Sequence, residues 1–392
     1  MVLRKFVNIL LLAALSINIF YFWRSGLPQP SHFIMVFAIL FYLLFNSFLV
    51  FESYWIWGVS FVYYTIIVNL IVFAKHTDIS TLLASFYYLF NFIVFIFIIN
   101  FSRKMGKSFF KVLFWIYLVQ IMMMTFLSLF SVGRYFSTNR YMGFFNDPNQ
   151  MGNWVLWACI IVIVTGKVVY KKWWLQGIIA LVLTTITIIF TASRSATVGL
   201  ITLWFTFVFI GIVNYFHNSK KKLKLSIKQL LFLTLVICIL TITLLSSFIN
   251  SKENAFFDAI IMQAKYTVNR FNEKGLDDTF AGRGYDRICK YPEYLLFGAG
   301  EGAHYRFAEK SLFLGEIHSS WAGVLFYYGI IGSLLFYIFL FKIARKISWF
   351  SLLLLSPISY GFATYNIRNW NFWIGLALLY VCSQILMKEE AV

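Results

Sequence analysis

The sequence predicts an all-α membrane protein, a polytopic transmembrane bundle of about twelve spanning helices. Its residues are 61% hydrophobic and only 12% charged, whereas a soluble domain usually carries about twice that share of charge. Stretches of the ~20 apolar residues that a spanning helix needs recur along the whole chain. These stretches are continuously apolar rather than alternating, which disfavours an outer-membrane β-barrel. We therefore expect residues 1–392 to form a single integral membrane domain.

The apolar stretches define the predicted spans in order. They cover residues 6–23, 33–51, 55–74, 80–101, 109–131, 152–166, 174–192, 196–216, 229–249, 318–341, 348–366 and 370–387. The first stretch follows Arg4 and Lys5 and has no convincing small-residue cleavage site, so we expect a retained helix rather than a signal peptide. Residues 250–317 are predicted to form one large loop.

The distribution of positive charge predicts the orientation of the spans. If the N-terminus is cytoplasmic, that side of the membrane holds 18 of the 33 lysines and arginines, and the short outer loops hold 6. The remaining 9 lie in the large loop, and long loops cross the membrane largely regardless of charge. The contrast between the short loops therefore places both termini in the cytoplasm. This topology explains the formal charge of +18, so we expect no nucleic-acid partner.

Acidic residues and cysteines narrow the possible functions. Ten of the 15 acidic residues lie in the large loop, and no predicted span has a carboxylate near its centre. Cation-coupled transporters usually need one there, which weakens the interpretation as a transporter. The four cysteines form no CxxC motif or Cys/His cluster and suggest no disulfide framework. We expect no metal site and no cofactor.

The first candidate site immediately precedes the sixth span. The run Asn146-Asp147-Pro148-Asn149 favours a turn, and its amide and carboxylate groups are suited to hydrogen-bonding sugar hydroxyls. Arg140 lies six residues before this run. The alternative interpretation is an ordinary turn that caps the next helix.

The second candidate site is the hairpin between the seventh and eighth spans, which carries Ser193-Arg194-Ser195. The hairpin is so short that Arg194 must lie at or just below the outer interface, where a charge is costly unless it is paired or reaches water. One interpretation is an arginine that snorkels to the interface. The other is an anion site that faces a cavity in the protein.

The third candidate site is the large loop. Apolar residues from Phe256 to Phe271 follow helical spacing and predict an amphipathic helix on the membrane surface. Farther on, Arg283, Arg287 and Lys290 fall at i, i+4 and i+7, which is one face of a helix if this segment is helical. Like charges so spaced repel one another. The segment is therefore either a solvated face or a phosphate site, because arginine binds phosphate through two parallel hydrogen bonds.

The loop returns to the membrane at His318, which opens the tenth span. Pro292 is expected to end the preceding helix, and Gly298-Ala299-Gly300-Glu301-Gly302 to form a flexible turn. A lone histidine at a helix end is more often a cap or an interfacial residue than a catalyst. Beside an arginine cluster, however, histidine is well placed to accept a hydroxyl proton near neutral pH.

Taken in order, these motifs resemble those of the O-antigen polymerase and O-antigen ligase superfamily. The resemblance covers roughly residues 130–340. It rests on Arg140-x-x-Gly143-x-Phe145-x-x-Pro148-Asn149, Ser193-Arg194, Gly282-Arg283, Gly298-x-Gly300, and His318 opening a helix that runs into Gly329-Ile-Ile-Gly332. Ser319 stands where the family often has asparagine, so no role of that amide is carried over.

The resemblance implies a glycosyltransferase of the C-type architecture in the bacterial inner membrane, with the large loop in the periplasm. Its donor would be an oligosaccharide on undecaprenyl diphosphate. A polymerase would join this donor to a second lipid-linked repeat unit, and a ligase would transfer it to the lipid A core; we favour the polymerase. Membrane lipids and a polysaccharide chain-length regulator would be further partners.

The resemblance also implies roles for individual residues. His318 would be the base that activates the acceptor hydroxyl, and Arg194 and Arg283 would hold the diphosphate leaving group. The sequence has no Asp-x-Asp motif, which fits a metal-independent reaction. Glu301 or Glu316 would be the next candidate base. The candidate substrate-binding residues are Arg140, Asn146, Asn149, Arg287, Lys290 and Glu301.

A lipid-linked oligosaccharide flippase or another transporter is the main alternative from a different class. A flippase should place cationic residues within its central spans to draw a diphosphate through the membrane. Here the basic residues lie at span ends and in loops, which disfavours that function. The remaining alternative is a non-catalytic membrane scaffold. The presence of the arginines together with His318 argues against a scaffold.

Overall fold

The computed structural model describes residues 2–24, 26–45, 49–137, 139–170, 173–218, 255–272, 279–311 and 313–390. Within these ranges, eight helices are long and apolar enough to cross a membrane. The chain is therefore a multi-pass membrane protein. The eight helices are α3 (Ile56–His76), α4 (Ile79–Ser102), α5 (Lys107–Leu129), α6 (Pro148–Val169), α7 (Trp173–Thr191), α8 (Arg194–Asn218), α12 (Ser320–Lys346) and α14 (Trp370–Glu390).

Three other predicted spans correspond to shorter helices. They are α1 (Val2–Ser16), α2 (Pro30–Phe45), and the 3-10 helix η5 (Ser348–Leu354) that continues into α13 (Leu355–Gly361). The predicted span 229–249 lies outside the described residues. Helix α1 ends where Gln120 of α5 donates hydrogen bonds to the carbonyls of Leu15 and Ser16, at 3.0 and 2.7 Å. These bonds satisfy carbonyl groups that are left open at the end of a helix.

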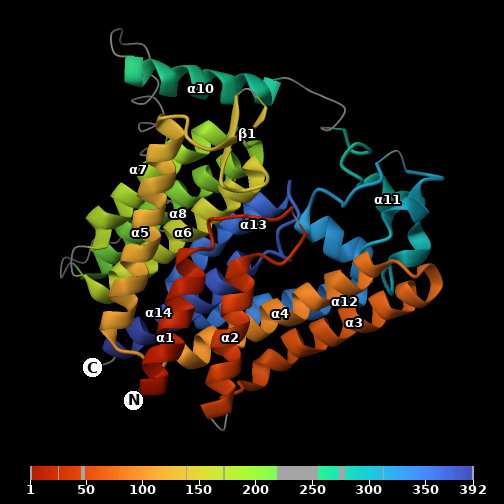
Figure 1. Ribbon diagram of the computed structural model, residues 1–392, viewed down its shortest axis with the longest axis horizontal. Helices are drawn as coiled ribbons and strands as arrows, with labels where there is room; N and C mark the ends of the chain where they lie inside the picture. The colour runs from red at the N-terminus through yellow and green to blue at the C-terminus, as the bar shows by residue number, and fades with distance from the viewer. Residues whose placement is uncertain are drawn as a thin grey trace.

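The spanning helices pack around α6 and α14. The most apolar part of α6 is 89% buried and that of α14 is 83% buried, against 39% for α3 and α8. Figure 1 shows that α1 begins and α14 ends at one end of the molecule. The opposite end holds a hairpin of β1 (Arg134–Ser137) and β2 (Arg140–Gly143), and we call it the loop end.

Helix α10 (Ala255–Asn272) lies across the loop end, where the sequence predicts an amphipathic helix (Figure 1). Its contacts with the bundle are partly polar. Thr267 donates to the carbonyl of Ile189 at 3.1 Å, and Gln263 donates to the carbonyl of Asn139 at 2.6 Å. The apolar residues Val268 and Phe271 face outward and are exposed. The helix therefore rests on the bundle through a mixed face and leaves apolar side chains free on its outer side.

Helix α12 is interrupted at Gly329, whose backbone has φ 64° and ψ −173°. The glycine-rich segment 298–302 lies in this interruption, and the N–H groups of its second and third residues donate to the carbonyls of Phe326 and Tyr327 at 2.9 and 2.7 Å. Irregular backbone within a membrane bundle is tolerated where protein satisfies its polar groups. The expectation of a flexible turn is thus wrong, because the segment is pinned by backbone hydrogen bonds to α12.

Candidate functional site

A cavity of about 710 Å³ lies among the helix ends at the loop end of the bundle. Its walls come from the α1–α2 connection, the first turns of α4 and α6, the residues just before α12, and the connection between α13 and α14. Hydroxyl, amide and charged side chains make up most of this lining. Segments that are far apart in the sequence therefore converge on one polar space.

The turn before α6 supplies Asp147 and Asn149 to the cavity. Asp147 is the N-cap of α6, and its side chain accepts a hydrogen bond from the N–H of Asn149 at 2.7 Å, which confirms the predicted turn and cap. The Asn149 side-chain oxygen accepts from Ser193 Oγ, also at 2.7 Å. Asn146 instead donates to the carbonyl of Trp23 at 2.6 Å. Of the two predicted asparagines, Asn149 lines the cavity, and Asn146 bonds the turn to the connection between α1 and α2.

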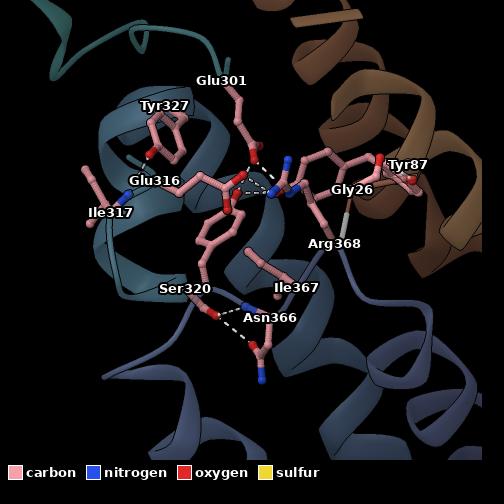
Figure 2. Close-up of polar contacts among 12 residues, drawn as sticks. Gly26, Tyr87, Glu301, Glu316, Ile317, Ser320, Tyr327, Asn366, Ile367 and Arg368 are labelled. Atoms are coloured by element: carbon pink, nitrogen blue, oxygen red, sulfur yellow. Dashed lines mark hydrogen bonds and ion pairs between the residues drawn. The ribbon is translucent and has the colours of Figure 1, made fainter. Parts of the chain in front are cut away.

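Buried amides and hydroxyls form another wall of the cavity. Asn366 donates from Nδ2 to Asn153 Oδ1 at 3.1 Å. Ser320 Oγ donates to Asn366 Oδ1 at 2.6 Å, as Figure 2 shows. Asn153 is 2% exposed, and its Nδ2 has no hydrogen-bond partner among the described residues. Because a buried donor without a partner is costly, this amide is well placed to bind a polar ligand.

Arg368 lies between two carboxylates at the edge of the cavity. Its Nε is 2.9 Å from Oε1 of Glu301, and its Nη2 pairs with Oε1 of Glu316 (Figure 2). Glu301 is fully buried and also accepts hydrogen bonds from the hydroxyls of Tyr328 and Tyr365, at 2.8 and 3.0 Å. Glu316 is 39% exposed at its side chain and lines the cavity. One carboxylate thus anchors the guanidinium group, and the other faces the open space.

The two carboxyl groups differ in protonation behaviour. Burial raises the pKa of the Glu301 carboxyl above its ordinary value, although Arg368 opposes this effect. Burial acts in the same direction on Glu316, but the charges of Arg368, His304 and His318 outweigh it and lower the pKa of that carboxyl. Glu316 is therefore the carboxylate that stays ionised beside the cavity at neutral pH.

His318 lies at the cavity, two residues before α12 begins, and it is exposed. Its backbone N–H donates to the carbonyl of Arg283 at 3.1 Å, and its ring packs against the ring of Phe313 with centroids 4.9 Å apart. Arg283 Nη1 donates to the carbonyl of Ala363 at 3.4 Å, next to Thr364 in the cavity wall. The fold thus brings the predicted base and one predicted arginine to the same edge of the cavity.

Three arginines gather where α10 meets the bundle. Arg194 Nη1 donates to the carbonyl of Arg270 at 3.1 Å, and Arg270 Nη1 donates to the carbonyl of Ala192. Burial lowers the pKa of Arg140, and the charges of Arg270 and Arg194 lower it further, against the opposing charge of Asp147. Arg140 and Arg194 therefore share one positively charged region with Arg270, a residue that the sequence motifs did not single out.

Two other predicted substrate-binding residues, Arg287 and Lys290, make contacts within the loop rather than with the cavity. Helix α11 covers only Asp286–Lys290, so Arg283 lies before it and the three cations do not share one helical face as the spacing suggested. Arg287 is fully buried, lies over the ring of Phe307 at 5.0 Å, and donates to the carbonyl of Phe313. Lys290 pairs with Asp286 at 2.9 Å. The α11 helix is too short to present all three cations together.

Arg368, Asn153 and Asn366 were not among the residues predicted from the sequence. A signal was present for Arg368, because the charge count predicts it in a short outer loop, where the charge rule disfavours arginine, as it also does for Arg194. The two asparagines gave no such signal, since each is an uncharged residue at the end of a predicted span and belongs to none of the motifs described above.

Comparison of the sequence with models of known protein families and with curated proteins found no match.

Acidification should destabilise the protein through His304. Burial lowers the pKa of His304 to about 4, and the ring Nδ1 has no hydrogen-bond partner among the described residues. The unfolded histidine takes up a proton near pH 6.5, so the stability is present above that pH and is lost as the pH falls toward 4. Between pH 7 and pH 5 this proton uptake should cost about 2 kcal/mol of unfolding free energy.

The measurement is the thermal unfolding midpoint in detergent at pH 7 and pH 5. The drop should be smaller in His304→Gln than in the wild type, while the control His76→Gln should behave like the wild type. Equal drops in all three proteins would contradict the prediction.

Proposed function

We propose that this protein is a membrane glycosyltransferase of the O-antigen polymerase type. It joins oligosaccharide repeat units carried on undecaprenyl diphosphate, at the periplasmic face of the bacterial inner membrane. The observation that carries the proposal is the cavity, in which His318, an ionised Glu316 and buried amides meet beside Arg283. Its volume of about 710 Å³ lies within the usual range of ligand pockets, ~300–1,000 Å³.

Each group in and around the cavity has a role in this reaction. His318 takes the proton from the acceptor hydroxyl as the oxygen attacks the anomeric carbon. The bond from that carbon to the diphosphate breaks, and the diphosphate leaves with the electron pair. Arg283 on one side, and Arg140, Arg194 and Arg270 where α10 meets the bundle, supply positive charge that stabilises this leaving group. The amides of Asn149 and Asn153 hydrogen-bond sugar hydroxyls.

Transfer to the lipid A core, the reaction of a ligase, would use the same groups with a different acceptor. A flippase is less well supported, because the charged residues of the eight described spanning helices lie near helix ends. A diphosphate would therefore meet no positive charge halfway along these helices.

The decisive experiment for this proposal uses the purified protein and a lipid-linked repeat unit as the sole substrate, with the glycan products separated on a gel. A ladder of lengths supports the polymerase. A product that forms only after lipid A core is added identifies a ligase, and the absence of product under both conditions rejects glycosyl transfer.

The orientation is tested with a reporter fused after Lys274, in the large loop. If both termini are cytoplasmic and residues 250–317 are periplasmic, a reporter that is active only in the periplasm should be active at this position. A reporter that is active only in the cytoplasm should be silent there. The opposite result would invert the orientation that the charge count predicts.

Substitution of Arg194 or Arg283 by lysine should impair the reaction nearly as much as substitution by alanine. Lysine keeps the charge but lacks the planar fork that matches a phosphate group. Protein yield should remain near that of the wild type, which detergent extraction and size-exclusion chromatography will show. Full activity in both lysine variants would leave these residues only a general charge role, and full activity in both alanine variants would remove them from the site.

A further inference from the structure

The cluster of Arg368, Glu301 and Glu316 has two acidic side chains and only one basic side chain. Arg368 Nε lies 2.9 Å from Glu301, which is fully buried and accepts two tyrosine hydroxyl hydrogen bonds as well. The Glu301 carboxyl group therefore holds the guanidinium group in place from a position that is closed to the cavity. Glu316 is the carboxylate of the cluster that stays ionised, and it lies at the side of the cluster that lines the cavity.

The backbone that follows Glu316 is held in place by two hydrogen bonds. The N–H of Ile317 donates to the Tyr327 hydroxyl at 2.8 Å, and the N–H of His318 donates to the carbonyl of Arg283 at 3.1 Å. Ile317 is fully buried, whereas Glu316 and His318 both line the cavity. Figure 2 shows Glu316 directed at Arg368, with Tyr327 and Ile317 beside it. The Glu316 carboxylate and the His318 imidazole, two residues apart on a segment held by hydrogen bonds, thus face the same cavity.

We propose that Glu316, held by Arg368, is a positioning residue for proton transfer: its negative charge stabilises the imidazolium that forms when His318 takes the proton of the acceptor hydroxyl. This inference rests on the proposed glycosyl transfer. The O–H bond of the acceptor breaks, an N–H bond forms on His318, and the anomeric carbon exchanges its bond to the diphosphate for a bond to the acceptor oxygen. The proton then leaves His318 for water. A buried or half-buried carboxylate beside a catalytic histidine acts in this way in other enzymes.

The surrounding charges support this role for Glu316 rather than for Glu301. Glu301 faces tyrosine hydroxyls and Arg368 and is closed to the cavity. Glu316 interacts electrostatically with His318 and His304 as well as with Arg368. The titratable and charged groups around this point include Glu301, Glu316, Arg283, Arg287, His304, His318, Tyr88, Tyr327, Tyr328, Tyr365 and Arg368.

The test compares the pH dependence of glycosyl transfer in the wild type and in Glu316→Gln. Glutamine keeps a hydrogen-bonding group near Arg368 but removes the charge, so the protonated imidazole becomes less favourable. We expect a loss of about 10- to 100-fold in rate at neutral pH. We also expect the acid limb of the pH–rate profile to move to lower pH by about one unit. Binding of the lipid-linked donor should be unchanged.

Two further variants keep the test decisive. Glu316→Asp shortens the side chain but retains the charge, so the rate should fall while the acid limb stays at the wild-type pH. This variant provides a test even if Glu316→Gln gives too little folded protein. Glu309→Gln, in an exposed part of the same loop, is the matched control and should behave like the wild type. An unmoved acid limb in Glu316→Gln, or a moved limb in Glu316→Asp, overturns the role of Glu316. A wild-type protein that makes no product overturns the proposed function, and this inference with it.

Discussion

Substitution of His318 by alanine should remove most of the glycosyl transfer activity while leaving the protein folded. A positioned general base typically contributes ~100- to 10,000-fold in rate, and in the proposed function His318, which lines the cavity, is that base. Its hydrogen bond to the carbonyl of Arg283 comes from the backbone, so it survives the substitution. The side chain itself is exposed, and exposed substitutions seldom cost much stability.

The experiment measures detergent-solubilised yield, binding of the lipid-linked donor and product formation for His318→Ala and His318→Gln. Donor binding should survive in both variants, because in the proposed function the arginines, and not His318, hold the diphosphate. Glutamine retains hydrogen bonding but cannot act as a base. A His318→Gln protein that is folded and fully active would show that another group accepts the proton, with Glu316 the first candidate.

Substitution of Gly298 by alanine should greatly reduce the amount of folded protein. The backbone of Gly298 has φ +91°, and an added Cβ would lie 2.4 Å from the carbonyl oxygen of Tyr327 in α12. A left-handed backbone conformation costs a non-glycine residue about 1–3 kcal/mol, and the steric clash adds to that cost. The neighbouring atoms belong to backbone that cannot move without breaking the hydrogen bonds between segment 298–302 and α12.

Gly106→Ala is the matched control for this prediction. Gly106 has an ordinary φ of −82°, and no heavy atom lies within 4 Å of an added Cβ. Yield and thermal unfolding midpoint in detergent should therefore remain close to those of the wild type. Equal stability of Gly298→Ala and Gly106→Ala would mean that segment 298–302 is not packed against α12 in the way described.

Most of the helices could be predicted from the sequence, because uninterrupted apolar stretches leave few alternatives in a membrane. The predicted spans 80–101 and 174–192 agree closely with α4 and α7. Hydropathy does not predict the end of a helix where the apolar stretch continues beyond it, as it does after α1. Gln120, a residue more than a hundred positions away, bonds to the last carbonyls there. Such an end depends on tertiary contacts that composition does not contain.

The site was predictable only in part. His318 and Asn149 were predicted and line the cavity, because each sits beside a local signal, a loop that returns to the membrane and a capping turn. Arg368 was counted merely as one positive charge in a short loop. Its importance arises from Glu301 and Glu316, which belong to a different loop and reach it only after the helices have packed. Pairings of this kind have no periodicity in the sequence.

The hydrogen bonds between segment 298–302 and the interrupted α12 bear on how this protein can be recombined with a related one. The loop holds its shape by bonding to a particular helix, and Arg368 in turn bonds to two residues of that loop. In a chimera that exchanged the loop alone, segment 298–302 of one protein would have to form its hydrogen bonds with α12 of the other. The smallest exchangeable unit is therefore residues 279–369, and loop grafts intended to transfer specificity should carry α12 and the connection before α14 with them.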